Sequence, residues 1–143
     1  MKILAEISVG ELYDKITILN IKLKKINDPN KLKNIKIELD ALVEESNKLI
    51  LKDDEIFRKN IQKLQDINEE LWDIENTKRE CEANKEFGEI FIKISRDVHF
   101  KNDIRASIKK EINLLSNSKI TEEKEYSKSV SYTHLTLPTI CSV

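Results

Sequence analysis

The sequence has no long apolar run and almost no net charge, and each absence excludes a class of protein. It contains no stretch of about 18 apolar residues and no basic-then-apolar leader, so it predicts neither a membrane span nor a secretory signal. Its 25 basic and 26 acidic residues leave a net charge of −1, which gives no overall attraction to nucleic acid or to an anionic membrane. We therefore expect a cytoplasmic protein.

The C-terminal residues differ from the rest of the chain in composition. Although 36% of all residues are Asp, Glu, Lys or Arg, residues 129–143 contain none of them. Residues 130–139 read VSYTHLTLPT, which resembles, residue for residue, the translation of a transposon-based sequencing-library adapter. We interpret residues 129–143 as a non-native, disordered tail that replaces the natural C-terminus. Residues 1–128 are then expected to form a single helical domain.

Setting the tail aside leaves one cysteine, Cys81, which excludes an intrachain disulfide and a Cys/His zinc site. The sequence also has no Walker loop, dinucleotide fingerprint or nucleophile elbow. Glu70 and Asp73 form a Glu-x-x-Asp pair of the kind that holds magnesium, but no second acidic pair precedes them at a suitable spacing. Arg96 stands where a Glu-x-x-His iron motif ending at His99 needs an acid. The sequence therefore predicts no cofactor or metal and favours a non-enzymatic role.

Periodic apolar residues predict four helices. The first starts at a capping box of Ser8 and Glu11 and runs to about residue 26; its wide apolar stripe predicts more than one neighbour. The second starts at Asp28 and Pro29. The third runs from about residue 54 towards residue 81, and residues 84–88 form the turn into the fourth, which reaches about residue 115.

Amphipathic helices joined by short turns must bury their apolar stripes on one another. We therefore expect an all-α fold, an antiparallel bundle of four amphipathic helices with a long helical hairpin made by the third and fourth. Residues 1–7 and 119–126 lack helical period and are expected to pair as two short strands. Apolar stripes on long helices of a small protein commonly contact a second chain, so we also expect a homodimer.

Charge is uneven along the chain. The range Lys15 to Lys36 contains seven lysines and one aspartate, a local net charge of +6, and residues 38–55 contain seven acids and two lysines, a local net charge of −5. We interpret these runs as solvated faces of antiparallel helices whose opposite charges lie side by side. RNA binding through Lys15 to Lys36 is the alternative, although no aromatic or Arg residues interleave the lysines.

Polar residues interrupt the apolar stripes of the last two helices. In the fourth helix, Lys101 and Arg105 stand where the spacing predicts apolar residues, and the stripe of the third helix includes Asn68 and Glu75. An unpaired buried charge costs several kcal/mol, so each of these cations is expected to have a partner. Antiparallel packing of the two helices would bring Glu75 near one of them. One interpretation is a polar network that fixes how the helices align. The other is a pocket for an anionic ligand, with Arg105 as the binding fork and Trp72 as a wall.

Four segments together carry a family resemblance. They are ISVGELYDKITILNIKLKKINDPNKLKNIKIEL, NEELWDIEN, KNDIRASIKKEIN and EEKEY, and they span nearly all of residues 1–126. In order and spacing they resemble a bacterial family of short helical proteins, domain of unknown function 6165. The chain departs from the family pattern at Asn76, where an acid is usual, and at Glu125, where Ser is usual. The resemblance implies no particular reaction.

The polar positions that match the family motifs overlap the interruptions of the stripes. They are Lys15, Lys22, Asn68, Trp72, Glu75, Asn102, Asp103, Arg105, Lys109 and Asn113. All of them except Asp103 and Asn113 make up the ligand-binding hypothesis. We expect a helical protein–protein interaction or assembly module that acts as a homodimer or with a protein partner. The alternative is a binding protein or enzyme for an anionic compound, phosphorylated or sugar-linked, held around Glu75 and Arg105.

Overall fold

The structure is a computed structural model that describes residues 1–117, apart from the side chain of Lys52. Its elements are α1 (Val9–Lys25), α2 (Pro29–Ser46), a short 3-10 helix η1 (Ile50–Asp53), α3 (Glu55–Ala83) and α4 (Glu89–Leu115). The all-α fold, the four helices and the turn at residues 84–88 are thus confirmed. The tail at residues 129–143 lies outside the described residues.

Side-chain caps mark the starts of α1, α2 and α3. Ser8 Oγ accepts a hydrogen bond from the Glu11 amide at 3.1 Å, and Asp28 and Asp54 cap α2 and α3 in the same way. Each cap satisfies an amide that the first turn of a helix leaves without a partner. Helix α2 ends at Ser46, and the backbone is extended at Leu49, where η1 follows.

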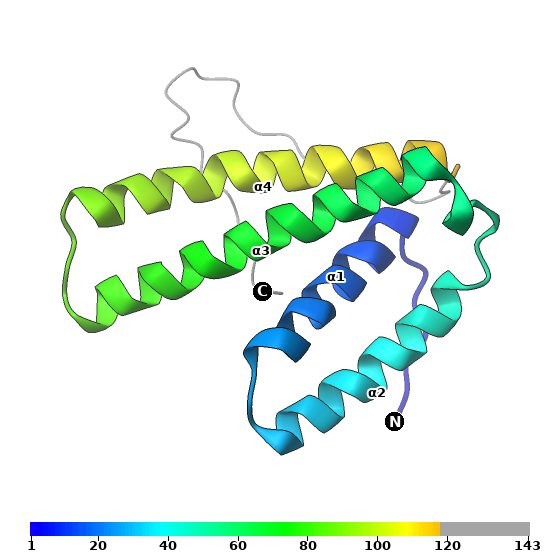
Figure 1. Ribbon diagram of the computed structural model, residues 1–143, viewed down its shortest axis with the longest axis horizontal. Coiled ribbons are helices and arrows are strands. Elements are labelled where there is room, and N and C mark those ends of the chain that lie inside the picture. Colours follow the sequence, from blue (N-terminus) through cyan, green and yellow to red (C-terminus); the bar gives the residue numbers. More distant parts are fainter. Residues whose placement is uncertain (118–143) are drawn as a thin grey trace.

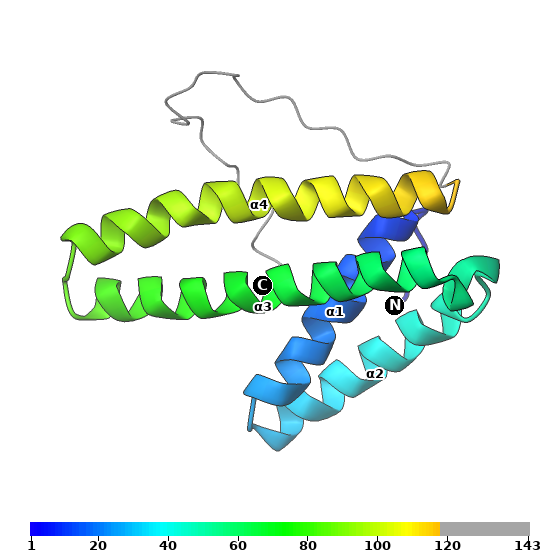
Figure 2. The same cartoon turned by 45° about the horizontal axis from the view of Figure 1, so that its top comes forward.

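The four helices form two antiparallel hairpins, α1–α2 and α3–α4, which cross each other obliquely (Figure 1). Helix α1 contacts all three other α-helices, as its wide stripe predicted. The α1–α2 hairpin packs against the start of α3 and the end of α4, so the other half of the α3–α4 hairpin extends beyond it (Figures 1 and 2). The long helical hairpin expected from the sequence is therefore present.

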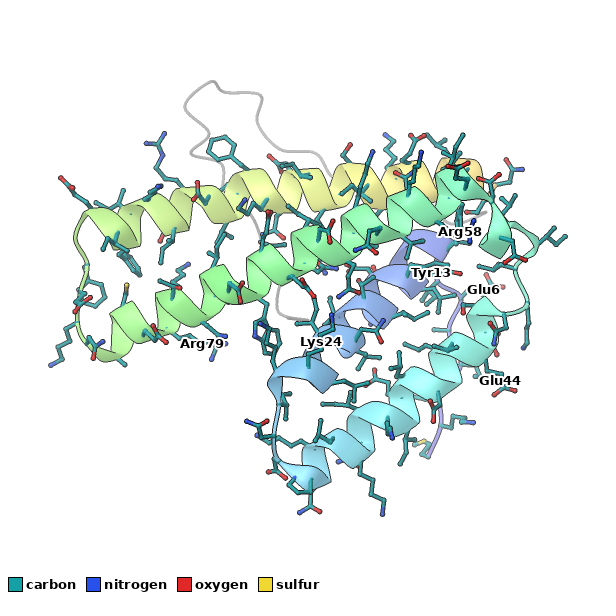
Figure 3. All side chains as sticks on the ribbon, viewed as in Figure 1. Glu6, Tyr13, Lys24, Glu44, Arg58 and Arg79 are labelled. Carbon is teal, nitrogen blue, oxygen red and sulfur yellow. The ribbon has the colours of Figure 1, made fainter. Side chains whose placement is uncertain are left out.

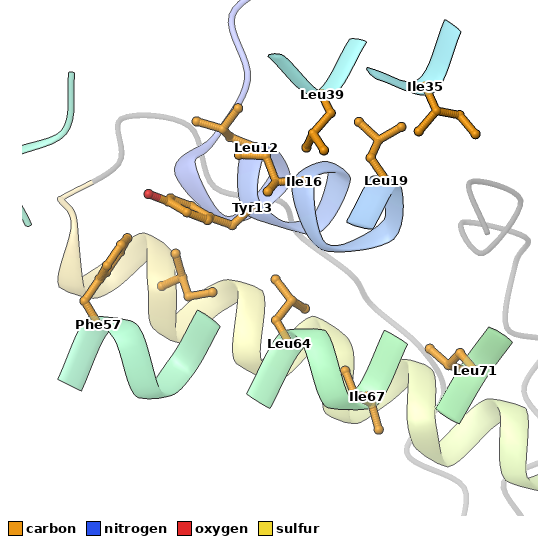
Figure 4. Packing of buried hydrophobic residues seen from close by; sticks show 11 residues of the cluster. Leu12, Tyr13, Ile16, Leu19, Ile35, Leu39, Phe57, Leu64, Ile67 and Leu71 are labelled. Atoms are coloured by element: carbon orange, nitrogen blue, oxygen red, sulfur yellow. The ribbon is translucent and has the colours of Figure 1, made fainter. Parts of the chain in front are cut away.

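The apolar core lies where α1 is enclosed by the other helices (Figure 4). Leu64 and Leu71 of α3 are buried on one side of α1, and Leu39 of α2 is buried on the opposite side of α1. The rings of Tyr13 and Phe57 meet edge to face with centroids 5.3 Å apart, an arrangement that aromatic pairs prefer. This core holds α1 in place beside both long helices.

The structure differs from the sequence-based expectations at the N-terminus and in the pairing of the lysines of α1. Residues 1–7 form no strand and are exposed, whereas residues 119–126, their expected partner, lie outside the described part. Lys24 (labelled in Figure 3) and Lys25 of α1 pair with Glu69 and Asp73 of α3, at 3.3 and 3.9 Å, and not with the acidic residues 38–55. The reason is that α1 packs on α3 as well as on α2.

Among residues 1–117, no helix is both long and apolar enough to cross a membrane.

Candidate functional site

A buried ion pair joins α1 to α4. Arg105 donates from Nε to Asp14 Oδ1 at 2.9 Å and from Nη2 to Asp14 Oδ2 at 2.5 Å. Arg105 is 4% exposed and Asp14 is 1% exposed. This parallel, two-bond geometry is the strongest that a guanidinium and a carboxylate make, and it fixes the orientation of both side chains.

Further polar side chains surround the pair. Lys109 Nζ lies 2.8 Å from Glu11 Oε2 and 3.8 Å from Asp14 Oδ2. Asn68 of α3 donates from Nδ2 to Asp14 Oδ1 at 3.0 Å and to Thr17 Oγ1 at 2.9 Å. We call Glu11, Asp14, Thr17, Asn68, Arg105 and Lys109 the polar cluster. Its two acids and two bases balance in charge, and it links three helices.

A glycine lets α1 approach α4 closely at the edge of the cluster. The Gly10 amide donates to Asn113 Oδ1 at 2.7 Å. A Cβ atom on Gly10 would lie only 2.6 Å from the Lys109 carbonyl oxygen and 2.9 Å from Asn113 Oδ1. Real Cβ atoms essentially never come that near to a backbone oxygen, so a side chain here would push the helices apart. Gly10 therefore sets the distance at which Arg105 reaches Asp14.

The electrostatics of Asp14 follow from two opposing effects. Burial by itself raises the pKa of the carboxyl, because it disfavours the charged form. The hydrogen bonds and charge of Arg105, the charge of Lys109 and the Asn68 amide outweigh burial, so the pKa of Asp14 lies below its ordinary value of 3.8. The carboxylate is thus the stable form at neutral pH.

This lowered pKa predicts a loss of stability in acid. The carboxylate stabilises the fold above the unfolded pKa, and the stabilisation is lost as pH falls from about 4 towards the lower folded pKa. We expect the free energy of unfolding to fall more steeply between about pH 4 and pH 2 than in a variant with Asp14→Leu and Arg105→Met. Urea denaturation at several pH values measures both slopes, and parallel slopes would contradict the assignment.

A comparison with protein families identifies the chain's relatives. A model described as "Family of unknown function (DUF6165)" matches residues 1–142. The chain belongs to this family. The match includes residues 129–142, and the adapter origin of residues 129–143 remains a hypothesis. No curated protein matches the chain, and no solved structure does either.

Three of the positions through which the sequence resembles DUF6165 lie in the polar cluster, namely Asn68, Arg105 and Lys109. Asn102 is buried beside it and donates from Nδ2 to the Val98 carbonyl oxygen at 3.0 Å. Trp72 is half-buried one turn along α3 from Asn68. Within the described part of the chain, four buried atoms have no hydrogen-bond partner: Asn68 Oδ1, Trp72 Nε1, Ser95 Oγ and Asn102 Oδ1.

Glu75, the expected carboxylate partner, does not pair with Arg105, which uses Asp14 instead. Glu75 lies 3.9 Å from Arg79 on its own helix. Lys101 Nζ lies 3.2 Å from Glu70 Oε2, which aligns α3 with α4 at that level. Glu75 is five residues nearer the turn than Glu70, and Arg105 is four residues farther from it than Lys101. Nine residues of helical rise, about 13 Å, therefore separate the two side chains along the hairpin.

The two lysines of the hypothesis occupy different places. Lys15 lies 3.7 Å from Glu11 with a side chain 41% exposed, so it borders the polar cluster on the solvent side. Lys22 is half-buried two turns farther along α1. The structure therefore gathers only part of the predicted ligand set at one place.

Sequence reasoning missed Asp14 and Thr17. A signal was present, because steps of 4, 3 and 4 back from the buried Ile21 lead through Thr17 and Asp14 to Gly10. This is the second face of α1, which contacts α3 and α4. Positions on a face that must be buried are core positions whatever residue occupies them. A polar residue there therefore needs a buried partner.

Proposed function

We propose that the chain is a helical protein–protein interaction or assembly module. The observation that carries the proposal is the outer face of α4, where Ile90, Phe100 and Ile104 are 67%, 39% and 48% exposed. Helices α1, α2 and α3 all lie on the other side of α4 (Figure 2). Several large apolar side chains exposed along one helix are typical of a surface that docks another protein.

The interior of the protein supports the same proposal. Arg105 and Lys109 already have carboxylates of α1 as partners, so these two buried cations hold the helices together. A network of this kind holds the two hairpins in one alignment. The extended half of the α3–α4 hairpin then presents its side chains on a rigid support, which favours specific docking.

An anionic ligand at the cluster is the second candidate. Two of the buried polar atoms without a partner favour it, because Trp72 Nε1 on α3 and Ser95 Oγ on α4 can each donate a hydrogen bond to an anion. Such a ligand would have to displace Asp14 from the Arg105 fork or bind beside it. A native mass spectrum of the intact chain would show it as a retained adduct.

Site-specific photocrosslinking in living cells tests the docking face. A photoreactive amino acid at position 104 is expected to form discrete crosslinked species of higher mass, because this side chain lies on the exposed face of α4. The same amino acid at Glu44 is the control, since Glu44 lies on the outer side of α2 (Figure 3). Equal crosslinking at the two positions would contradict the proposal.

A further inference from the structure

We propose that the docking partner is a second copy of this chain, whose α4 packs antiparallel on the outer face of α4. This inference rests on the proposed role as an interaction module and names its partner. It arises from the spacing and charge of the residues on that face. When the face is placed against a second copy running in the opposite direction, apolar residues meet apolar residues and Lys93 meets Glu111. The two copies would be related by a two-fold axis that passes between the α4 helices.

The outer face of α4 carries a heptad seam. Its positions step by 3 and 4 along the whole helix: Ile90, Lys93, Asp97, Phe100, Ile104, Ser107, Glu111 and Leu114. The apolar members are exposed, from Phe100 at 39% to Ile90 at 67%. The buried residues of α4, such as Val98 and Ile112, lie roughly 150° away around the helix axis at 3.6 residues per turn. Helix α4 therefore has two opposite seams, and the one that contains Val98 and Ile112 packs within the chain.

The seam is complementary to itself when reversed. In one antiparallel alignment, Ile90 meets Leu114 of the second copy, and Phe100 meets its Ile104. Lys93 then meets Glu111 of the second copy, and each contact occurs twice because of the two-fold axis. Antiparallel coiled coils pair their alternate seam positions in this way, with knobs from one helix in holes of the other.

The charges select this alignment over a shifted one. If Ile90 were placed against Ile104 of the second copy, Asp97 would face its own equivalent, and like charges in direct opposition are unfavourable. Within residues 1–117, neither Lys93 nor Glu111 takes part in an ion pair. Both side chains are exposed and remain available to a second copy.

Charge reversal at one seam pair tests the inference. In Lys93→Glu, two glutamates face each other at each Lys93–Glu111 contact, and in Glu111→Lys two lysines do. Each variant alone is expected to dimerise about tenfold or more weakly, because an attraction becomes a repulsion at two contacts. An equimolar mixture is expected to form a heterodimer, because each contact between positions 93 and 111 then pairs a glutamate with a lysine. Native mass spectrometry resolves the three species, and far-UV circular dichroism checks that each variant is folded.

Two controls carry the same charge changes elsewhere. Lys110→Glu lies on α4 but off the seam, and Glu44→Lys lies on α2; both positions are exposed. Neither should change dimerisation of the intact chain by more than about twofold. A wild-type chain that is monomeric at all concentrations would overturn the inference. So would dimers that both seam variants retain.

The two proposals fail in different ways. If position 104 crosslinks to a different protein and the wild-type chain is monomeric, the inference of self-pairing is wrong while the interaction module stands. If position 104 crosslinks to nothing above the Glu44 control and the chain is monomeric, both are wrong. Crosslinks between two copies, lost when Lys93→Glu is expressed alone and regained with Glu111→Lys, support both.

Discussion

Asp14→Ala is expected to lower the free energy of unfolding by about 3–5 kcal/mol, because it leaves the buried charges of Arg105 and Lys109 without their shared carboxylate. Domains of this size have a total stability of about 5–15 kcal/mol, so the variant would be close to unfolding at room temperature. Urea denaturation followed by circular dichroism measures the loss. The hydrogen bond of Asn68 to Asp14 disappears as well, which adds to the cost.

Two comparisons separate this effect from ordinary loss of a charge. Asp73→Ala removes the exposed partner of Lys25 and should cost less than about 1 kcal/mol. The double change Asp14→Leu with Arg105→Met replaces the ion pair by apolar side chains, and it should recover most of the loss, since apolar replacements of buried pairs are often near neutral. If Asp14→Ala itself cost less than about 1 kcal/mol, the pair would not be a buried, tightly coupled one.

Gly10→Ala is expected to be the second most damaging single change, although it adds only one methyl group. The new Cβ would lie 2.6 Å from the Lys109 carbonyl oxygen, and a backbone atom in a helix cannot move aside. The helices must separate, which weakens the Gly10–Asn113 hydrogen bond and stretches the Asp14–Arg105 pair. Overpacking of this kind costs about 1–3 kcal/mol or more, measurable as a lower midpoint of thermal unfolding.

Gly88→Ala is the matched control for this prediction. Within residues 1–117, no atom outside Gly88 and its local backbone lies within 4 Å of a Cβ at this position. The φ of Gly88, −84°, is one that any residue adopts. Alanine restricts the unfolded chain, which stabilises, but Gly88 is the N-cap of α4, where glycine is preferred to alanine. The two effects oppose each other, so this variant should change the free energy of unfolding by less than about 1 kcal/mol. Equal effects at the two glycines would show that close approach at Gly10 is not what limits the substitution.

The helices could be predicted from the sequence because local chemistry determines their ends. Ser8, Asp28 and Asp54 each cap a helix through a bond to an amide two or three residues away, and such short-range bonds can be read from neighbouring letters. The interruption at Arg105 was also visible as a charge on an apolar stripe. Its burial follows from position alone, as for any residue on the inner face of an amphipathic helix.

The partner of Arg105 could not be predicted because it depends on how the two hairpins cross. Asp14 and Arg105 are 91 residues apart in sequence, and nothing local relates them. Glu75 was chosen because it shares a stripe on the neighbouring helix, but the alignment of α3 with α4 places it too far along the hairpin. Three-dimensional placement of α1 decides the pairing, and the small size of Gly10 is the sequence feature that permits it.

The long span of these contacts also sets the order in which the chain folds. The bonds of Gly10 to Asn113 and of Asp14 to Arg105 close loops of 103 and 91 residues, which costs more chain entropy than closing either hairpin. On the ribosome, α1 and α2 are made before α4, which carries Arg105 and Lys109, the partners of Asp14 and Glu11. At about 5–20 residues per second, the new α1 waits roughly 5–20 seconds with its second face uncovered. Translation speed therefore governs how long the nascent chain is exposed to aggregation or to chaperones.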